Sequence, residues 1–270
     1  MSAETVNPRI PSPRVPTPPI ARAGILSPRI LASTTERVLG QLRHDKRTLA
    51  LIIVVPALLL ALVYYVFDHR PLIFNHVGLI MLGIFPFVLM FLITSIAMLR
   101  ERTSGTLERL LSTPLAKLDL LFGYALAFGL VAAIQAIVLT AVAYWAFNLT
   151  IAGSVWLVVL VAVADAILGM ALGLLASAFA RTEFQAVQFM PAIVFPQLFL
   201  CGLFAPRAEM AGFLDAISRA LPLTYAVQAL EEIGAHPSPT ALLWRDLGIV
   251  VGAAIVALAL AAATLRRRTD

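Results

Sequence analysis

The chain has 270 residues, of which 60% are apolar and only 13% are charged, and its mean hydropathy is +0.92. An ordinary soluble domain is about 45–50% apolar and about 25% charged, so this composition excludes a water-soluble protein. The formal net charge of +5 could indicate a nucleic-acid partner, but the positions of the charges favour a membrane protein with no nucleic acid bound. Cys201 is the single cysteine, which excludes an intrachain disulfide and a cysteine-based zinc cluster.

The first 29 residues are rich in proline and arginine and lack an apolar run of signal-peptide length. Such a sequence cannot bury enough apolar surface to fold, so residues 1–29 are expected to form a disordered cytoplasmic tail and residues 30–268 a transmembrane domain. The run Ser33-Thr34-Thr35-Glu36 then has the spacing of a capping box at a helix start. Alternating apolar and basic residues follow, which predicts an amphipathic helix on the inner membrane surface. A cytoplasmic extension of the first membrane span is the alternative.

Six stretches approach or exceed the roughly 20 apolar residues that a helix needs to cross a bilayer. They predict an all-α integral membrane protein with six transmembrane helices at Thr48–Phe67, Val77–Leu99, Leu120–Phe147, Ser154–Phe179, Ala186–Phe204 and Leu247–Leu265. With these spans, sixteen of the 20 Lys and Arg residues fall on one side of the membrane. Short basic segments stay cytoplasmic during insertion, so both termini are expected in the cytoplasm.

The predicted outer segment between the fifth and sixth spans, residues 205–246, is long and not uniformly polar. Gly212–Leu221 is apolar but too short to cross a bilayer, and after Pro222 apolar residues recur at helical spacing as far as Glu232. Two short outer helices of re-entrant or interfacial type are therefore predicted. A small extracellular cap without a role in transport is the alternative.

A short amphipathic helix is also predicted in the polar connection between the second and third spans, within Arg100–Leu115. Thr103 or Ser104 can cap its start, and Pro114 forces the residue before it out of helical geometry. Its apolar face consists of leucines at helical spacing, namely Leu107, Leu110 and Leu111. Either the membrane surface or a protein partner must cover this face.

Three segments resemble the permease subunits of type-2 ABC exporters, including the drug-export permeases of the daunorubicin-resistance type. The run Glu101-Arg102-Thr103-Ser104-Gly105-Thr106-Leu107-Glu108-Arg109-Leu110 is similar to the family's Glu-Arg-x-x-Gly-Thr-Leu-Glu-x-Leu loop. Two later family segments are similar to Phe179–Glu183 with Gln188–Pro206, and to Leu221–Leu230. The likeness covers residues 30–268. It departs from the family pattern at Gln228 and Glu231, where the family often has Asp and Arg.

The resemblance implies a cytoplasmic coupling helix that docks on an ABC ATP-binding subunit through Glu101, Arg102, Gly105, Thr106, Leu107, Glu108, Leu110 and Leu111. The chain contains no Gly-x-x-x-x-Gly-Lys-Ser/Thr phosphate loop, so the expected cofactors, ATP and Mg, would bind to that separate subunit. The chain itself would be a transport subunit, not an enzyme. Two identical or homologous permeases would pack together among the lipids of a bacterial inner membrane and export drugs, lipids or, less expectedly, polysaccharide.

Candidate substrate-path residues lie on three predicted spans and consist of Phe87, Met90, Phe91, Thr94, Asp165, Gln188, Phe195 and Phe199. Soft and aromatic faces accept varied apolar ligands, although such side chains also commonly face lipid. Asp165 lies near the centre of the fourth span, where a charged group costs roughly 2.5–3.5 kcal/mol. Asp165 is predicted either to serve transport or to form a hydrogen bond to a neighbouring helix.

An ion-coupled secondary transporter with Asp165 as the coupling site is the alternative function. Such transporters usually carry internal repeats and several midplane charges. The two three-span halves of this sequence show no convincing repeat, and Asp165 stands alone. An intramembrane protease is disfavoured because all four histidines lie outside the predicted spans. The exporter subunit therefore remains the leading hypothesis.

Overall fold

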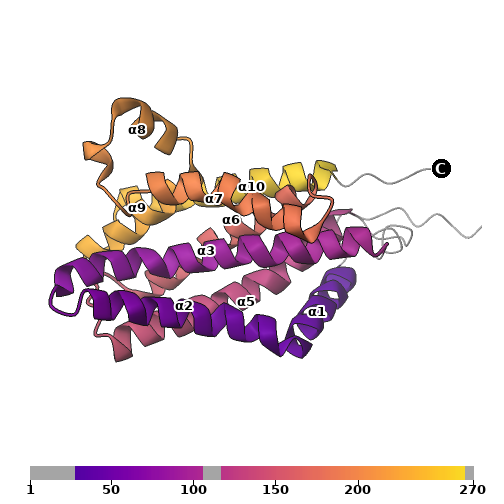
Figure 1. The fold of residues 1–270 in the computed structure, drawn as a ribbon, viewed down its shortest axis with the longest axis horizontal. Helices are drawn as coiled ribbons and strands as arrows, with labels where there is room; N and C mark the ends of the chain where they lie inside the picture. The colour runs from indigo at the N-terminus through magenta and orange to yellow at the C-terminus, as the bar shows by residue number, and fades with distance from the viewer. Residues whose placement is uncertain (1–27, 106–116, 265–270) are drawn as a thin grey trace, which may run out of the picture.

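The computed structural model describes residues 28–105 and 117–264, and every regular element within these ranges is a helix. In chain order these are α1 Pro28–His44, α2 Lys46–Val66, α3 Pro71–Thr103, α5 Lys117–Ala146, α6 Val155–Ser177, α7 Glu183–Leu200, the short 3₁₀ helix η1 Arg207–Glu209, α8 Gly212–Ser218, α9 Pro222–Ala235 and α10 Ala241–Thr264. The long helices run along a common axis (Figure 1). We call the two ends of this bundle the α1 end and the α8 end, after the helix that lies there.

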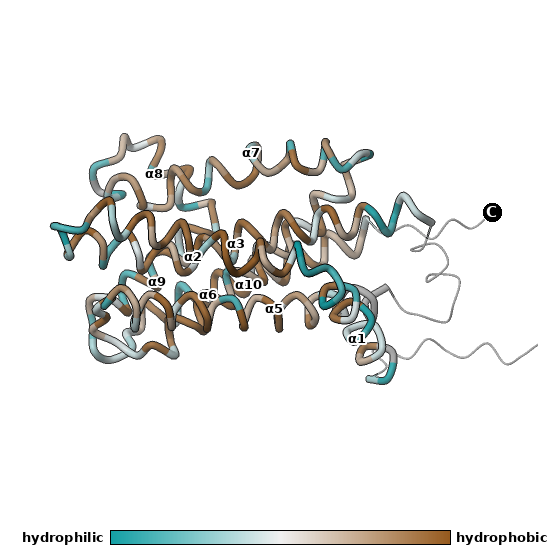
Figure 2. Tube along the Cα trace, turned by 60° about the horizontal axis from the view of Figure 1, so that its bottom comes forward, coloured by the Kyte–Doolittle hydropathy of each residue, from teal (hydrophilic) through white to brown (hydrophobic). Residues whose placement is uncertain are grey.

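Five of the helices, α2, α3, α5, α6 and α10, are long and apolar enough to cross a membrane. Figure 2 shows hydrophobic residues along the middle of the bundle and hydrophilic residues toward both ends, as a bilayer requires. The protein is therefore an all-helical, multi-pass membrane protein. Helix α7, which corresponds to the expected fifth span, does not meet the same criterion because Pro191, Pro196 and several glutamines interrupt its apolar character. The expected count of six spans is not confirmed by this criterion.

Helix α3 is longer at both ends than the expected span Val77–Leu99. It begins at Pro71, a residue type favoured at the first helical position, and continues past Leu99 to Thr103. The helix that Thr103 or Ser104 was expected to start lies outside the described residues, so that expectation stays a prediction. Thr103 Oγ1 donates to Leu99 O at 3.1 Å, and Ser104 is the C-cap of α3. Gly105 follows with φ +72°, a left-handed conformation typical of helix termination.

Helix α1 begins at Pro28, so the expected capping box at Ser33 lies inside the helix and that prediction is wrong. Thr34 and Thr35 are buried against α5, where Gly123 leaves space for them. A Cβ added to Gly123 would lie 2.6 Å from Thr34 Cγ2. Asp45 then separates α1 from α2 and caps α2, because its side chain accepts a hydrogen bond from Thr48 N. Helix α1 is consequently a separate helix and not a straight extension of α2.

The closest contact in the bundle is between α3 and α6, and glycines of α6 make it possible. A Cβ added to Gly169 would lie 2.2 Å from Phe87 O, and one added to Gly173 would lie 2.4 Å from Phe91 O. Small residues spaced four apart allow helix backbones to approach closely in membranes. Across the same contact, Thr94 Oγ1 lies 3.2 Å from Met170 O. Backbone contact and a polar side chain therefore both fix α6 on α3.

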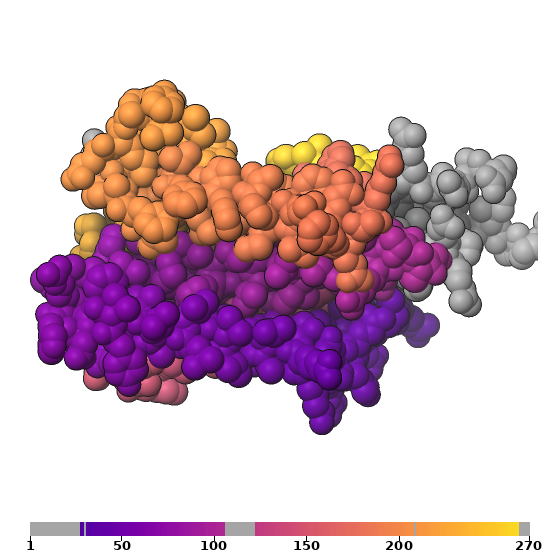
Figure 3. All heavy atoms as spheres, viewed as in Figure 1, coloured from indigo at the N-terminus to yellow at the C-terminus, as the bar shows by residue number. Residues whose placement is uncertain are grey.

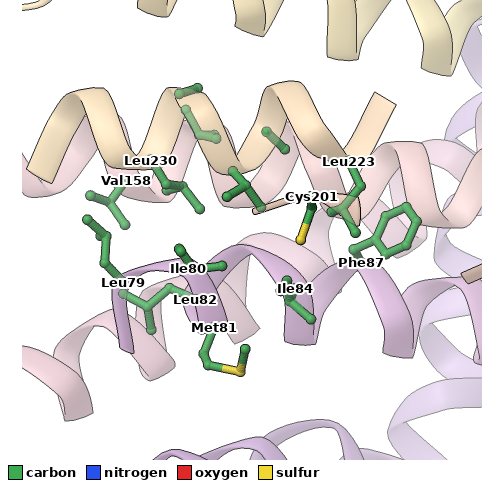
Figure 4. Close-up of a cluster of buried hydrophobic side chains, with 14 of the residues drawn as sticks. Leu79, Ile80, Met81, Leu82, Ile84, Phe87, Val158, Cys201, Leu223 and Leu230 are labelled. Atoms are coloured by element: carbon green, nitrogen blue, oxygen red, sulfur yellow. The ribbon is translucent and has the colours of Figure 1, made fainter. Parts of the chain in front are cut away.

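Helix α9 packs onto the first half of α3. A Cβ added to Gly83 would lie 2.7 Å from Leu230 Cδ1, and one added to Gly234 of α9 would lie 2.7 Å from Leu79 Cδ2. Figure 4 shows α3, α6 and α9 contributing to one apolar cluster, which includes Leu79, Ile84, Phe87, Val158, Leu223 and Leu230. The core thus lies between α3, α6 and α9, with α10 packed outside α6 and α9.

The two short helices expected in the outer segment are present as α8 and α9 but differ in burial. Leu230 of α9 is fully buried, whereas Phe213 of α8 is 67% exposed, and α8 stands out from the bundle (Figure 3). An ion-pair cluster fixes α8: the Asp215 carboxylate accepts from Arg207 Nη2 at 2.9 Å and from Arg219 Nη2 at 2.5 Å. The hydrogen bond from Arg219, together with the one from Arg207, lowers the pKa of Asp215. The re-entrant placement of these helices stays a prediction.

Candidate functional site

The expected coupling segment starts at the α1 end, where α3 terminates. Of its predicted contact residues, Glu101, Arg102 and Gly105 lie within the described part of the chain. The others lie outside the described residues, namely Thr106, Leu107, Glu108, Leu110 and Leu111. The structure therefore describes the start of the segment, while the apolar face of the segment stays a prediction.

Glu101 has a binding partner within the chain, while its predicted contact with a partner protein stays a prediction. Its side chain is 11% exposed, and its Oε1 accepts a hydrogen bond from Arg37 Nη1 of α1 at 2.8 Å. Arg37 Nη2 also donates to the Tyr124 hydroxyl of α5 at 3.4 Å, and the guanidinium carbon lies 5.9 Å from the centre of the Tyr124 ring. Burial alone lowers the pKa of Arg37, but the hydrogen bond to Glu101 and the charge of that carboxylate outweigh it and raise the pKa.

A second ion pair links the same end of α3 to α7. Arg100 Nε donates to Glu183 Oε1 at 2.7 Å and Arg100 Nη2 donates to Glu183 Oε2 at 3.1 Å, which is a two-point contact. Both side chains are more than half exposed, so solvent weakens this pair relative to Arg37–Glu101. The neighbouring Arg102 is partly buried, and its Nε has no hydrogen-bond partner within the described ranges.

The start of the coupling segment is therefore tied to α1 and α7 through two consecutive residues of α3. No local sequence pattern could have predicted these pairs, because Arg37 and Glu101 are 64 positions apart and Arg100 and Glu183 are 83 positions apart. A force applied to the end of α3 would reach both neighbouring helices, because charge-assisted hydrogen bonds hold them to it.

Replacing Arg37 with alanine is expected to destabilise the protein by about 3 kcal/mol, because it leaves the buried Glu101 carboxylate without its partner. The charge-swapped double variant Arg37→Glu/Glu101→Arg should recover part of this loss. Arg100→Ala, which breaks the exposed pair, serves as the control and should cost only about 0–1 kcal/mol. Denaturant unfolding of the purified variants measures these values. Equal losses for Arg37→Ala and Arg100→Ala would show that Glu101 is not held by Arg37.

The predicted substrate-path residues of α3 share one face, but this face is packed against α6. Phe87, Met90, Phe91 and Thr94 are each 0% exposed. The backbones of Phe87 and Phe91 meet the α6 glycines, and the Thr94 hydroxyl donates to Met90 O at 2.5 Å. In a single chain these side chains belong to the helix–helix contact and do not line an open path. A role for them in transport stays a prediction.

The predicted substrate-path residues of α7 lie on its outer surface. Gln188 is exposed, and Phe195 and Phe199 are 43% and 60% exposed. Phe199 contacts Phe195 edge-to-face at 6.5 Å and stacks on Phe204 at 5.3 Å between ring centres, forming an exposed aromatic run. The structure therefore does not bring the α7 residues together with those of α3. A shared path would require a second chain or a rearrangement.

Asp165 of α6 is fully buried, and neither of its carboxylate oxygens has a hydrogen-bond partner among the residues that the structure describes. The expected hydrogen bond to a neighbouring span is therefore not observed. Its Oδ2 lies 3.6 Å from the position that a Cβ would take at Gly83 of α3, and Leu230 Cδ1 of α9 lies 2.7 Å from the same position. A carboxylate without a partner is costly in such apolar surroundings.

Asp165→Asn is expected to leave ATP-driven efflux within about twofold of the wild type, because an asparagine of nearly the same shape fits the same apolar site without adding a charge. Efflux assays in whole cells, with the amount of folded protein measured in parallel, test this expectation. A large loss of transport at unchanged folded protein would instead assign Asp165 a proton- or ion-coupling role.

A groove of about 780 Å³ opens at the α1 end between α1, the start of α2, the last turns of α3 and the start of α5. One part of its wall is apolar and consists of Val38, Leu42, Ile93, Ile96, Ala97 and Phe128. The other part is polar and includes Gln41, Asp45, Thr48, Arg100, Glu101 and Tyr124. This volume is in the range of small-molecule sites. No sequence pattern predicts the groove, because its walls come from four separate helices.

Comparisons with known proteins agree with the family resemblance. The family model described as ABC-2 type transporter matches residues 29–233. This chain is 33% identical to "ABC transporter G family member 20" of Dictyostelium discoideum over 141 residues, which are 52% of this chain and 19% of that protein. It is 28% identical over 156 residues to "Probable multidrug ABC transporter permease YbhR" of Escherichia coli, which is 58% of this chain and 42% of the relative.

A third relative is "Linearmycin resistance permease protein LnrN" of Bacillus subtilis, with 26% identity over 168 residues, 62% of this chain and 43% of the relative. The matched part of the chain thus spans less than half of the length of each of these relatives. The family model extends from the start of α1 into α9 and includes the coupling segment, the buried α3–α6 contact and Asp165. The chain belongs to the ABC-2 type transporter family.

Proposed function

We propose that this chain is the membrane-spanning subunit of an ATP-driven exporter and works with a separate ABC ATP-binding subunit. The observation that carries the proposal is the anchoring of the coupling segment: Glu101 is bound to Arg37 of α1, and Arg100 is bound to Glu183 of α7. A displacement of the segment by the partner would therefore move α1, α3 and α7 together. ATP and Mg are placed on the partner, because the chain has no phosphate loop.

The proposed topology has six spans, with α7 as the fifth and both termini in the cytoplasm. Helix α2 starts, and α10 ends, at the α1 end of the bundle (Figure 1). An even number of crossings is needed for this arrangement, and α7 supplies the sixth crossing in addition to the five apolar helices. The excess of Lys and Arg on this side supports its assignment to the cytoplasm. Two bacterial relatives support a bacterial inner membrane as the location.

The proposed cargo is a drug, a lipid or another amphipathic molecule, with polysaccharide as a less favoured class. The words "multidrug" and "linearmycin resistance" in the names of two relatives support this choice. The proposed assembly contains a second permease copy or homologue. It would pack against the exposed aromatic run of α7 at Phe195 and Phe199. ATP-driven closure of the partner subunits moves the cargo outward, and the cargo must bind the inward-facing or leaflet-open state more tightly than the outward-facing one.

Co-expression of the full chain with a candidate ATP-binding protein tests the proposal. We expect the two to copurify and ATP hydrolysis to be stimulated by amphipathic drugs or lipids. Arg37→Ala should weaken the coupling between cargo and ATP hydrolysis, whereas the exposed Arg181, on the turn before α7, provides the control Arg181→Ala. Transport driven by an ion gradient and abolished by Asp165→Asn would favour the ion-coupled alternative instead.

A further inference from the structure

The groove at the α1 end has the form of a binding site for an amphipathic molecule. It lies where the hydrophobic middle of the bundle gives way to hydrophilic residues (Figure 2). Its apolar wall is formed mainly by Ile93, Ile96 and Ala97 of α3 and by Phe128 of α5, and these side chains suit a hydrocarbon chain. Its polar part lies at the bend between α1 and α2, where Asp45 and Thr48 line it.

Three cations lie close in sequence to the residues that line this polar part of the groove. Arg43, Lys46 and Arg47 are exposed and flank the lining residues Asp45 and Thr48 along the chain. Among the ion pairs within residues 28–105 and 117–264, none involves these three side chains. None of the three is therefore held in an ion pair by an acidic residue of the described chain.

The acidic groups of the groove have other partners. The Asp45 carboxylate accepts from Thr48 N at 3.2 Å and from Thr48 Oγ1 at 2.6 Å, and these bonds lower the pKa of Asp45. Glu101 is neutralised by Arg37 at 2.8 Å. With Arg43, Lys46 and Arg47 opposed by Asp45 alone, the charge at the bend is net positive, which favours an anionic ligand head.

We propose that this groove binds one anionic phospholipid, with the phosphate near Lys46 and Arg47 and one acyl chain along the α3 and α5 wall. The lining residues belong to helix ends at which hydrophobic residues give way to hydrophilic ones (Figure 2), and lipid head groups lie at this border of the bilayer. Basic residues directly beside a membrane span attract anionic lipids, and here they adjoin a groove of about 780 Å³ with an apolar wall. The proposal concerns lipid binding alone and does not depend on the identity of the transported cargo.

The test compares phosphatidylglycerol with phosphatidylcholine of the same acyl chains, added to the purified, delipidated full-length protein. Native mass spectrometry and thermal unfolding report binding. We expect phosphatidylglycerol to bind and stabilise the wild type more strongly, and Lys46→Gln/Arg47→Gln to bind it about tenfold more weakly. The control Arg29→Gln/Arg181→Gln removes two exposed cations that, unlike Lys46 and Arg47, are not adjacent in sequence to a residue of the groove lining, and it should bind like the wild type.

A second variant tests the apolar wall. Ala97→Trp fills the groove and should lose the bound lipid, whereas Ala97→Ser keeps the space open and should retain it. Equal binding of phosphatidylcholine and phosphatidylglycerol to the wild type would overturn the assignment of an anionic head group. Unchanged phosphatidylglycerol binding by Lys46→Gln/Arg47→Gln would overturn the assignment of the site, even where Ala97→Trp fails to fold.

Discussion

Replacing Gly169 with valine is expected to prevent the formation of a stable, folded protein. The Cβ of the new side chain would lie 2.2 Å from Phe87 O and 2.9 Å from Phe87 C, and both are backbone atoms of α3 that cannot rotate away. Overpacking of a core usually costs about 1–3 kcal/mol when side chains can adjust. Here the two helix backbones must separate, so the loss should exceed about 3 kcal/mol, which is a large part of the stability of a typical protein.

Gly252→Val is the matched control for this experiment. Gly252 also lies in an apolar helix of membrane-crossing length, but nothing lies within 4 Å of a Cβ added there. Both variants introduce the same β-branched residue into a helix, so the difference between them measures the α3–α6 contact alone. Size-exclusion chromatography and thermal unfolding in detergent give the readout. A Gly169→Val protein as stable as Gly252→Val would mean that α6 does not pack on α3 as described.

Leu110→Asp is expected to abolish ATP-driven efflux while the protein still inserts into the membrane at the normal level. In the predicted coupling helix, Leu107, Leu110 and Leu111 form the apolar face that a partner must cover. A carboxylate buried without a partner in that contact costs about 3 kcal/mol, which weakens docking roughly a hundredfold. Glu108→Lys, which reverses a charge beside this face, should have the same direction of effect.

The control for Leu110→Asp is Ser112→Asp, which adds the same charge two positions away. Two positions correspond to about 200° around a helix, so this change falls on the opposite face from Leu110. Efflux from cells and copurification of the ATP-binding subunit should both remain near the wild-type level for Ser112→Asp. If Leu110→Asp also retained both, the apolar face would not contact the partner.

The long helices of the bundle could be predicted because a long apolar run indicates a membrane-spanning helix. The predicted ends of these helices were less accurate, because apolar character stops at the edge of the bilayer while the helix continues. Helix α3, for example, extends from Leu99 to Thr103 with charged residues that are stabilised by Arg37 and Glu183. Helix α1 begins at Pro28 instead of Ser33, because packing of Thr34 on Gly123 outweighs the capping signal.

The contacts of the candidate site could not be predicted to the same extent. Phe87, Met90, Phe91 and Thr94 are three or four positions apart and so share one face of a helix, but helical spacing does not say what a face packs against. In the structure that face meets α6. The pair Arg37–Glu101 and the groove beside it depend on how four helices meet in space, and no short sequence pattern encodes such a meeting. The position of Asp165 in an apolar run predicts a buried carboxylate, whereas its lack of a hydrogen-bond partner within the described residues depends on how α3 and α9 pack around it.

The central claim is that this chain moves cargo only when a separate ATP-binding subunit drives it. Transport of an amphipathic dye or drug into lipid vesicles that contain the purified chain, with and without the copurified subunit, tests this claim directly. We expect uptake only when the subunit, ATP and Mg are all present, and no uptake with the chain alone. Sustained cargo movement in vesicles that contain no ATPase would contradict the account.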